Sequence, residues 1–556
     1  MRRSRVVAMA AGSAAVLGAV WLALPLMGSD LAAQVARADF FAAHGPTPVD
    51  LRWYAGVQQF GYSLVSQPVM ALLGVRVTGA LALVAAATAL AALLVRTGMP
   101  RPLLGSLVGV VTIAGNLVSG RVTYGLGVAF GLAALLALTL GPTGPPSAAE
   151  SPDARPAGRR GPVPGAATRL GLAAAGALLA SATSPVAGLF VGLAGAALLL
   201  TRRYADGLAL GVAAAVPLGA TALFFGDGGW MNISRTDTLR AALTSLLVAA
   251  LVAYRPVRVG ALLSAAGVVA AALVHTPVGL NATRLVVMFA LPVLAAAARP
   301  PAWLSARLGR RARPDGGAAT GSRRGRVLAG VGLAALLVGV CAWQPPVVPA
   351  DLRSIGDPTS SPGYHAPLRS FLAGQRLTGR VEVPPTRNYW EAARLGEVPL
   401  ARGWLRQADI DRNPLFFTTV PGAAGTGVPL TAASYRNWLA ENAVQYVAVP
   451  DAPLSWVGRA EAELVEGGLP YLTPVWSGPH WRVWAVADPT PLVGAPAELV
   501  RADGASVTFR SPTAATVAVR IRHSRWLSAS GGATVTAAGD WITVTVPRPG
   551  EYTVGS

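Results

Sequence analysis

The sequence predicts a polytopic α-helical membrane protein with about 11 spans, followed by a C-terminal extracytoplasmic domain that combines an α/β region with a β-sandwich. Hydrophobic residues make up 53% of the chain, charged residues only 13%, and the mean hydropathy is +0.49. A soluble protein carries about a quarter charged residues. Long apolar runs recur as far as Trp343, after which the composition changes. Residues 1–343 are therefore predicted to form the membrane domain.

The apolar runs define the predicted spans, because a helix needs ~20 apolar residues to cross a bilayer. The runs lie near 6–27, 76–95, 103–118, 122–140, 170–183, 185–200, 207–225, 238–253, 259–275, 281–298 and 327–343. Several of these runs are shorter than 20 residues, so the predicted number of spans is about 11.

The arginines indicate the orientation of these spans. The net charge is +20, of which +19 lies in residues 1–343 and +1 in residues 344–556. If the N-terminus is cytoplasmic, 21 arginines fall on the inner side and seven on the outer side, as the positive-inside rule requires. We therefore predict a multi-pass protein of the plasma membrane whose C-terminal domain is extracytoplasmic. The positive charge indicates topology, so nucleic acid is not a predicted partner.

Two basic linkers on the predicted inner side, 141–168 and 299–326, are rich in Arg, Gly and, in the first, Pro and Ala. Such segments suit the anionic inner leaflet, and we assign them no chemistry.

After residue 343 the pattern is that of a folded soluble domain. Strand-like segments at 446–449 and 481–484 and helix-like segments at 432–442 and 456–466 predict an α/β region over 344–490. From about residue 505 apolar residues alternate with period two, with turns at Gly531-Gly532 and Gly539-Asp540. This alternation predicts a β-sandwich over 491–556.

Polar residues are concentrated in the stretch 30–61, directly after the first apolar run. If this stretch begins as a helix, Asp30, Gln34 and Arg37 share one face, and Asp39 points nearly the opposite way. A partly desolvated carboxylate at the membrane boundary can act as a general base near neutral pH. Asp is also a preferred N-cap residue, so Asp30 could instead cap the helix that starts at Leu31, and the two roles can coexist.

The first apolar run is followed by Asp30-Leu31, Arg37-Ala38-Asp39-Phe40, Asp50-Leu51-Arg52-Trp53-Tyr54 with Gly56, and Gly61-Tyr62-Ser63. With these residues, the layout resembles the GT-C class of membrane glycosyltransferases, and within it the actinobacterial arabinofuranosyl- and mannosyltransferases of the cell envelope. Thr183-Ser184-Pro185 with Gly188 and Asn281-Ala282-Thr283-Arg284 fit less specifically.

The resemblance implies a sugar donor linked to polyprenyl phosphate, a glycan or protein acceptor of the cell envelope, and Asp30 as the general base. Asp39 is the second catalytic candidate. Family members often have adjacent or near-adjacent acids here, whereas in this chain the next acid is nine residues away. The wide spacing of the acids predicts no metal-ligand set, and the cofactor that the resemblance would suggest is a divalent cation.

Transfer from such a donor needs cations beside the leaving phosphate, where negative charge develops. The candidates on the predicted outer side are Arg284, Arg121 and Arg235, with His275 nearby. Arg284 ranks first, because it lies at the start of an apolar run, one turn after Asn281. For each arginine the alternative is a side chain that snorkels to the membrane interface.

The candidates for binding the acceptor or its sugar are Asp50, Trp53, Tyr54 and Arg37. Aromatic residues here are equally well explained by the belt that forms at membrane interfaces. The histidines of the C-terminal half show no ligand spacing, so no metal site is predicted there.

Two other functions stay open. A transporter or lipid flippase would place ionisable residues near mid-membrane, often in two matching halves, whereas here they lie at span ends. A non-catalytic cell-envelope scaffold would use the C-terminal domain for binding. The sequence contains no Walker, Rossmann, G-x-S-x-G or H-E-x-x-H motif, which argues against a nucleotide-driven pump or a soluble-type hydrolase.

Overall fold

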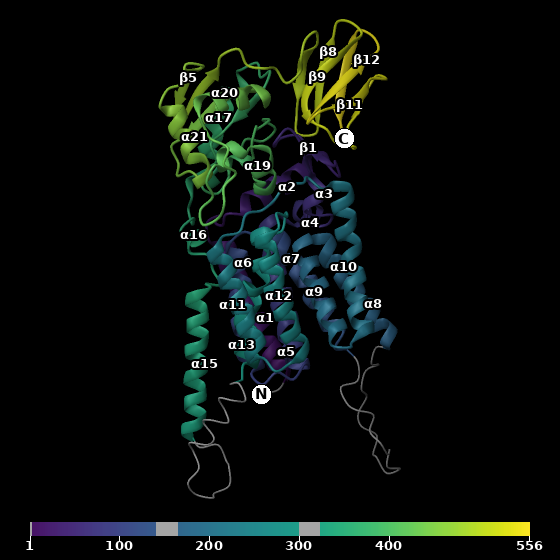
Figure 1. The fold of residues 1–556 in the computed structure, drawn as a ribbon, viewed down its shortest axis with the longest axis vertical. Helices are drawn as coiled ribbons and strands as arrows, with labels where there is room; N and C mark the ends of the chain where they lie inside the picture. The colour runs from purple at the N-terminus through teal and green to yellow at the C-terminus, as the bar shows by residue number, and fades with distance from the viewer. Residues whose placement is uncertain (1–2, 141–164, 300–322) are drawn as a thin grey trace, which may run out of the picture.

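The structure is a computed structural model that describes residues 3–140, 165–299 and 323–556. Most of the two predicted linkers, 141–168 and 299–326, lies outside the described residues. Figure 1 shows a helical bundle with the N-terminus at one end and the sheet-containing regions, with the C-terminus, at the other.

A helix occurs at each of the eleven predicted apolar runs. These helices are α1 (Arg3–Ala23), α5 (Val75–Arg96), α6 (Pro102–Val118), α7 (Val122–Ala137), α8 (Ala166–Thr183), α9 (Pro185–Leu200), α10 (Tyr204–Phe225), α11 (Arg235–Leu251), α12 (Arg255–Leu273), α13 (Arg284–Ala297, extended by the 3-10 turn η1 at Gly279–Thr283) and α15 (Arg323–Trp343). In the described chain six helices are long and apolar enough to cross a membrane, and four more are apolar but shorter. The chain is thus a polytopic helical membrane protein, and the count of eleven spans stays a prediction.

Small residues allow these helices to pack closely, as is common in membranes. A Cβ added at Gly105 of α6 would lie 2.5 Å from the Cβ of Ala296 in α13. Gly127 of α7 likewise lies against Ala187 of α9. Large apolar side chains on the outside of α10 and α15 remain exposed. Their exposure fits helices whose outer faces contact lipid.

A polar layer lies between the bundle and the sheet-containing regions (Figure 1). It consists of α2 (Leu31–His44), the short antiparallel pair β1 (Val49–Asp50) and β2 (Val57–Gln58), α3 (Gln59–Tyr62) and α4 (Ser66–Leu73). This layer contains the stretch 30–61 that the sequence marks as unusual.

The region after α15 is an α/β unit with a four-stranded sheet of order β3-β4-β6-β5. The first pair is parallel and the other two are antiparallel. Its strands are β3 (Arg380–Glu382), β4 (Val444–Pro450), β5 (Leu472–Gly478) and β6 (Trp481–Val486). Its helices are α16 (Pro349–Leu352), α17 (Pro362–Ala373), α18 (Glu391–Arg394), α19 (Arg406–Arg412), α20 (Ala432–Glu441) and α21 (Trp456–Glu466), with 3-10 turns η2 (Pro358–Ser360) and η3 (Pro414–Phe417).

The C-terminal strands form two antiparallel sheets, of order β10-β13-β8-β7 and β11-β12-β9. The strands are β7 (Glu498–Ala502), β8 (Ser506–Ser511), β9 (Ala515–Arg522), β10 (Ser528–Ala529), β11 (Thr534–Ala538), β12 (Trp541–Val546) and β13 (Gly550–Gly555). Alternate side chains from both sheets, including Phe509 and Val544, form one buried core. The period-two pattern of the sequence therefore marks the inward face of each strand.

Candidate active site

Asp30 lies at the N-terminal end of α2, where the helical bundle meets the polar layer. Its side chain makes no capping hydrogen bond to the helix. Instead its Oδ2 atom accepts from Arg121 Nε at 3.1 Å and from Arg284 Nη2 at 3.4 Å. Asp30 is 9% exposed, so water screens these ion pairs only weakly. The structure thus brings together one predicted carboxylate and two of the predicted cations.

Three elements far apart in sequence build this cluster. Arg121 immediately precedes α7, Arg284 is the first residue of α13, and Asp30 immediately precedes α2. The Arg284 guanidinium also lies over the ring of Tyr124, 5.4 Å from its centre. Both cations come from the ends of bundle helices, so the cluster sits at the boundary of the apolar region.

The two oxygens of Asp30 differ in their surroundings. Oδ2 accepts hydrogen bonds from both guanidinium groups. In the described part of the chain Oδ1 accepts one hydrogen bond, from Ser29 Oγ at 3.3 Å. Oδ1 therefore keeps lone pairs free to accept a proton or a hydrogen bond from a further molecule.

The α/β unit completes the outer wall of the cluster. Trp404 Nε1 donates to the carbonyl oxygen of Ser29 at 3.0 Å, and the Trp404 ring lies edge-on to Tyr62. Burial lowers the pKa of Arg406, but the nearby Tyr389, Asp409 and Asp30 outweigh burial and raise it overall. Sequence reasoning missed Trp404 and Arg406, because nothing in their local pattern links them to Asp30.

The predicted inward face of α2 is visible in the structure. Gln34 Nε2 donates to Tyr62 Oη at 2.7 Å, and Gln34 Oε1 accepts from Thr123 Oγ1 at 2.6 Å. Arg37 is 2% exposed and lies over the rings of Tyr62, at 4.2 Å, and Trp53, at 5.5 Å. Its Nε and Nη2 atoms have no hydrogen-bond partner within the described chain, and burial lowers its pKa. Arg37 is therefore a buried hydrogen-bond donor whose Nε and Nη2 groups are unpartnered in the described chain, and it lies on the same face of α2 as Asp30.

Asp39 lies on the exposed side of α2. Nine residues of helix place it ~13 Å along the axis from Asp30. Desolvation raises its pKa, against the opposing effect of Arg394 and Arg52. The structure does not bring Asp39 to Asp30, and no role beside Asp30 is proposed for it.

Three predicted acceptor-binding residues pack the junction between the membrane domain and the α/β unit. Asp50 and Arg52 form a buried ion pair at 2.8 Å. Trp53 Nε1 donates to the Ala392 carbonyl at 3.2 Å, and Tyr54 Oη donates to the Gly403 carbonyl at 2.5 Å. The hydrogen bonds and ion pair of Asp50, Trp53 and Tyr54 are therefore made within the protein, and all three residues are buried.

Arg235 and His275 lie apart from the cluster. Arg235 is exposed at the start of α11, and His275 stacks on Trp230 with ring centres 4.3 Å apart. Within the described chain neither side chain forms a hydrogen bond or ion pair with Asp30.

An apolar hollow of about 330 Å³ opens among α5, α7, α9, α11, α12 and α13. Its lining includes Tyr124, whose ring Arg284 covers, and Leu285, the next residue along α13. It also includes Arg203 and Tyr254, which lie in the turns at the other end of the bundle. The hollow therefore extends from beside the Asp30 cluster through the apolar layer.

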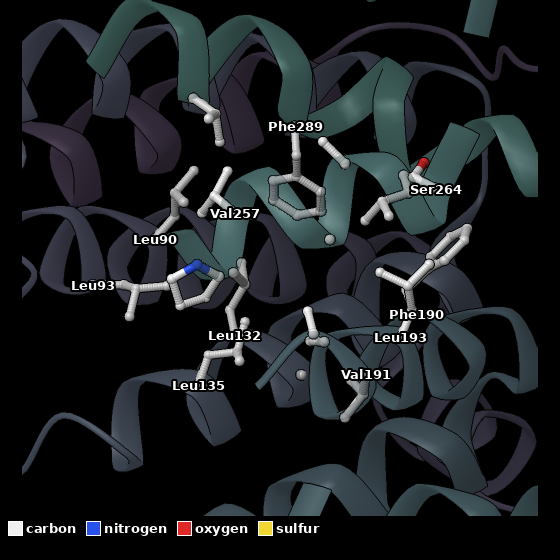
Figure 2. A pocket seen from close by; sticks show the side chains of 18 of the residues that line it. Leu90, Leu93, Leu132, Leu135, Phe190, Val191, Leu193, Val257, Ser264 and Phe289 are labelled. Atoms are coloured by element: carbon white, nitrogen blue, oxygen red, sulfur yellow. The ribbon is translucent and has the colours of Figure 1, made fainter. Parts of the chain in front are cut away.

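The side chains around the hollow are almost all hydrocarbon. Figure 2 shows Leu90, Val257 and Phe289 on one side, and Leu132 and Phe190 on the other. Such a lining suits a hydrocarbon chain rather than an ion or a sugar.

The donor set around Asp30 does not suit a divalent cation. Magnesium and calcium sites require several oxygen ligands, whereas this cluster holds one carboxylate and at least two guanidinium groups. In residues 3–140, 165–299 and 323–556, no group of three or more His, Cys, Asp or Glu side chains is arranged to hold a metal. We therefore derive no step through a metal ion.

No protein-family model matches the chain, and no curated protein matches it in sequence. Among solved structures, the arabinofuranosyltransferase AftD from Mycobacteria matches with a TM-score of 0.43 and 18% identity, over 92% of this chain and 41% of AftD. ArnT from Cupriavidus metallidurans, bound to undecaprenyl phosphate, matches with a TM-score of 0.42 and 15% identity, over 87% of this chain and 97% of ArnT. The chain thus spans about two-fifths of the length of AftD.

Proposed function

We propose that the protein is a membrane glycosyltransferase that moves a sugar from a polyprenyl-phosphate donor to an acceptor of the cell envelope at the extracytoplasmic face. The observation that carries the proposal is a single carboxylate held by two arginines, one of which lies over Tyr124, a residue that lines an apolar hollow. The hollow takes the first part of the isoprenoid tail, and the arginines take the phosphate.

The residues perform the transfer as follows. The acceptor hydroxyl attacks the anomeric carbon of the donor sugar, and its proton passes to Oδ1 of Asp30. The bond between the anomeric carbon and the phosphate oxygen breaks, and polyprenyl phosphate leaves with the electron pair. Arg121 and Arg284 stabilise the charge that develops on this phosphate. A sugar oxygen or an anionic group on the acceptor can use the unpartnered N–H groups of Arg37.

The direct experiment incubates the purified full-length protein, in liposomes, with a panel of labelled polyprenyl-phosphate sugars and an envelope acceptor fraction. Transfer of label to the acceptor, with release of polyprenyl phosphate, supports the proposal. Intact donors across the whole panel would overturn it.

A lipid flippase is the second candidate, because the hollow reaches residues at both ends of the bundle. In that case the same liposomes would move a labelled polyprenyl-phosphate sugar between leaflets without consuming it.

Filling the hollow should weaken donor binding. Ala261 of α12 lines the hollow, whereas Ala270 on the same helix is exposed. We expect Ala261→Phe to raise the donor KM by about 10-fold or more, since a lost tail contact of a few methylene groups costs ~0.8 kcal/mol for each. Ala270→Phe should leave the KM unchanged. Equal values for the two variants would show that the tail binds elsewhere.

Removing the Arg284 charge should affect the chemical step as well as binding. We expect Arg284→Gln to lower kcat/KM by about 10²-fold or more, because the Arg284 guanidinium stabilises the charge that develops on the leaving phosphate. Arg284→Lys should recover only part of this loss, since lysine lacks the planar fork. Steady-state kinetics with each variant measure both effects, and Arg235→Gln, at a cation outside the cluster, should stay close to wild type.

A further inference from the structure

The loop that carries Asp30 is held by a segment more than 300 residues away in sequence. Asp351, in the short helix α16 after the last bundle helix, accepts from the Ser29 amide at Oδ1, at 3.0 Å. Its Oδ2 atom accepts from Ser119 Oγ at 2.6 Å. Three residues further on, Ser354 Oγ accepts from the Gly28 amide at 3.0 Å. Asp351 is 3% exposed, so these bonds lie away from competing water.

The other side of the loop rests on the turn between α6 and α7. The Asp30 amide donates to the Ser119 carbonyl at 3.1 Å. Gly28 has φ +101°, and a Cβ there would lie 2.4 Å from the Val118 carbonyl oxygen. The loop and the turn are therefore in direct backbone contact, and no larger residue fits at position 28.

The Asp351 carboxylate thus binds a residue close in sequence to each member of the Asp30–Arg121 ion pair. Ser29, which it binds at one oxygen, precedes Asp30 and also contacts Oδ1 of Asp30. Ser119, which it binds at the other, lies two residues before Arg121. A carboxylate that joins the Ser29 backbone to the Ser119 side chain restrains the distance between the base and the cation.

We propose that Asp351 is a positioning residue that sets Asp30 against Arg121, so that the segment after the last bundle helix determines the geometry of the reaction. The kinetic consequences of this inference rest on the proposed glycosyl transfer. The contacts of Asp351 are independent of it. In the described chain Asp351 has no hydrogen bond or ion pair with Asp30, Arg121 or Arg284, and it acts through Ser29 and Ser119.

The kinetic test compares Asp351→Ala with Asp351→Asn in the full-length protein. We expect the Ala variant to lose about 10²-fold in kcat with little change in donor KM, because a misplacement near 1 Å costs about that much. The Asn variant should recover most of kcat, since its amide oxygen can accept from Ser29 and its amide nitrogen can donate to Ser119.

Asp357→Ala is the matched control. Asp357 lies six residues along the same segment and accepts from Thr359 and Asn388. It has no hydrogen bond to residues 28–30 in the described chain. A kcat loss in Asp357→Ala equal to that in Asp351→Ala would point to general loosening and overturn the positioning role.

Hydrogen exchange gives a measure that needs no activity. Amides of residues 24–31 should exchange faster in Asp351→Ala than in the wild type, Asp351→Asn or Asp357→Ala. If the wild type transfers no sugar, the proposed function fails and the exchange result still decides whether Asp351 holds the loop. Unchanged exchange in Asp351→Ala, or full kcat in that variant of an active enzyme, would overturn the inference.

Discussion

Asp30→Asn is expected to lower kcat by about 10³-fold while the protein inserts and folds normally. The substitution keeps the shape of the side chain but removes the group that accepts the acceptor proton, and general-base contributions lie at about 10²–10⁴-fold. Asparagine can still accept from Arg121 and Arg284 through its amide oxygen, so the architecture of the cluster should survive.

The donor KM of Asp30→Asn should not rise, whereas a variant with a damaged binding site would show a higher KM. In the wild type the Asp30 carboxylate neutralises part of the charge of Arg121 and Arg284. In the Asn variant the positive charge of both arginines is no longer neutralised, so it attracts the donor phosphate more strongly, and we expect the donor KM to stay the same or to fall. A lower kcat with an unchanged or lower KM separates loss of the base from loss of the binding site.

The control is Asp237→Asn, at an acid on the same end of the bundle. The Asp237 carboxylate accepts from Oγ of Ser234, the N-cap residue of α11, and Asp237 has no ion pair with the cluster in the described chain. It should keep wild-type kinetics. Full activity of Asp30→Asn, with size-exclusion and thermal-unfolding profiles like those of the wild type, would remove Asp30 as the base.

The sequence contains enough information for one half of this site. Helical spacing places Asp30, Gln34 and Arg37 on one face, because α2 is regular from its first turn. The choice of Arg121 and Arg284 rests only on their positions at the ends of apolar runs. Arg235 satisfies the same criterion and lies elsewhere, so the criterion alone does not identify the cluster.

The other half depends on contacts that no local pattern encodes. Trp53 and Tyr54 resemble interfacial aromatics in sequence, yet they are buried because the α/β unit supplies Ala392 and Gly403 as partners. The residues Trp404, Arg406 and Asp351 lie near Asp30 in space although each is more than 300 residues away from it in sequence. Only the docking of the α/β unit on the bundle defines which polar residues face the site.

The geometry of α19, which carries Arg406 toward the site, depends on a buried charge cluster. Arg402 contacts Asp409 at 3.0 Å, Glu461 at 2.9 Å and Glu382 at 3.6 Å, and its side chain is 1% exposed. Desolvation raises the pKa of Glu382 and of Glu461, and the Arg402 charge opposes this rise. Asp409 belongs to α19, so the cluster ties this helix to the core of the α/β unit.

Arg402→Met is therefore expected to destabilise the α/β unit by about 3–5 kcal/mol at pH 8, because it leaves buried carboxylates without a cation. The deficit should shrink at lower pH. Without Arg402 the pKa values of the carboxylates rise further above their values in the unfolded chain, so protonation as the pH falls stabilises the folded variant.

Thermal unfolding of the full-length protein in detergent at pH 8 and pH 5.5 measures both effects. Arg376→Met, which removes an exposed pair with Glu498, should show no measurable change at either pH. An Arg402→Met deficit that is the same at both pH values would mean that the loss comes from packing of the arginine stem against Phe416 rather than from uncompensated charge. A deficit that falls with pH, together with lower transfer activity at pH 8, would show that α19 must be held in place for Arg406 to act beside Asp30.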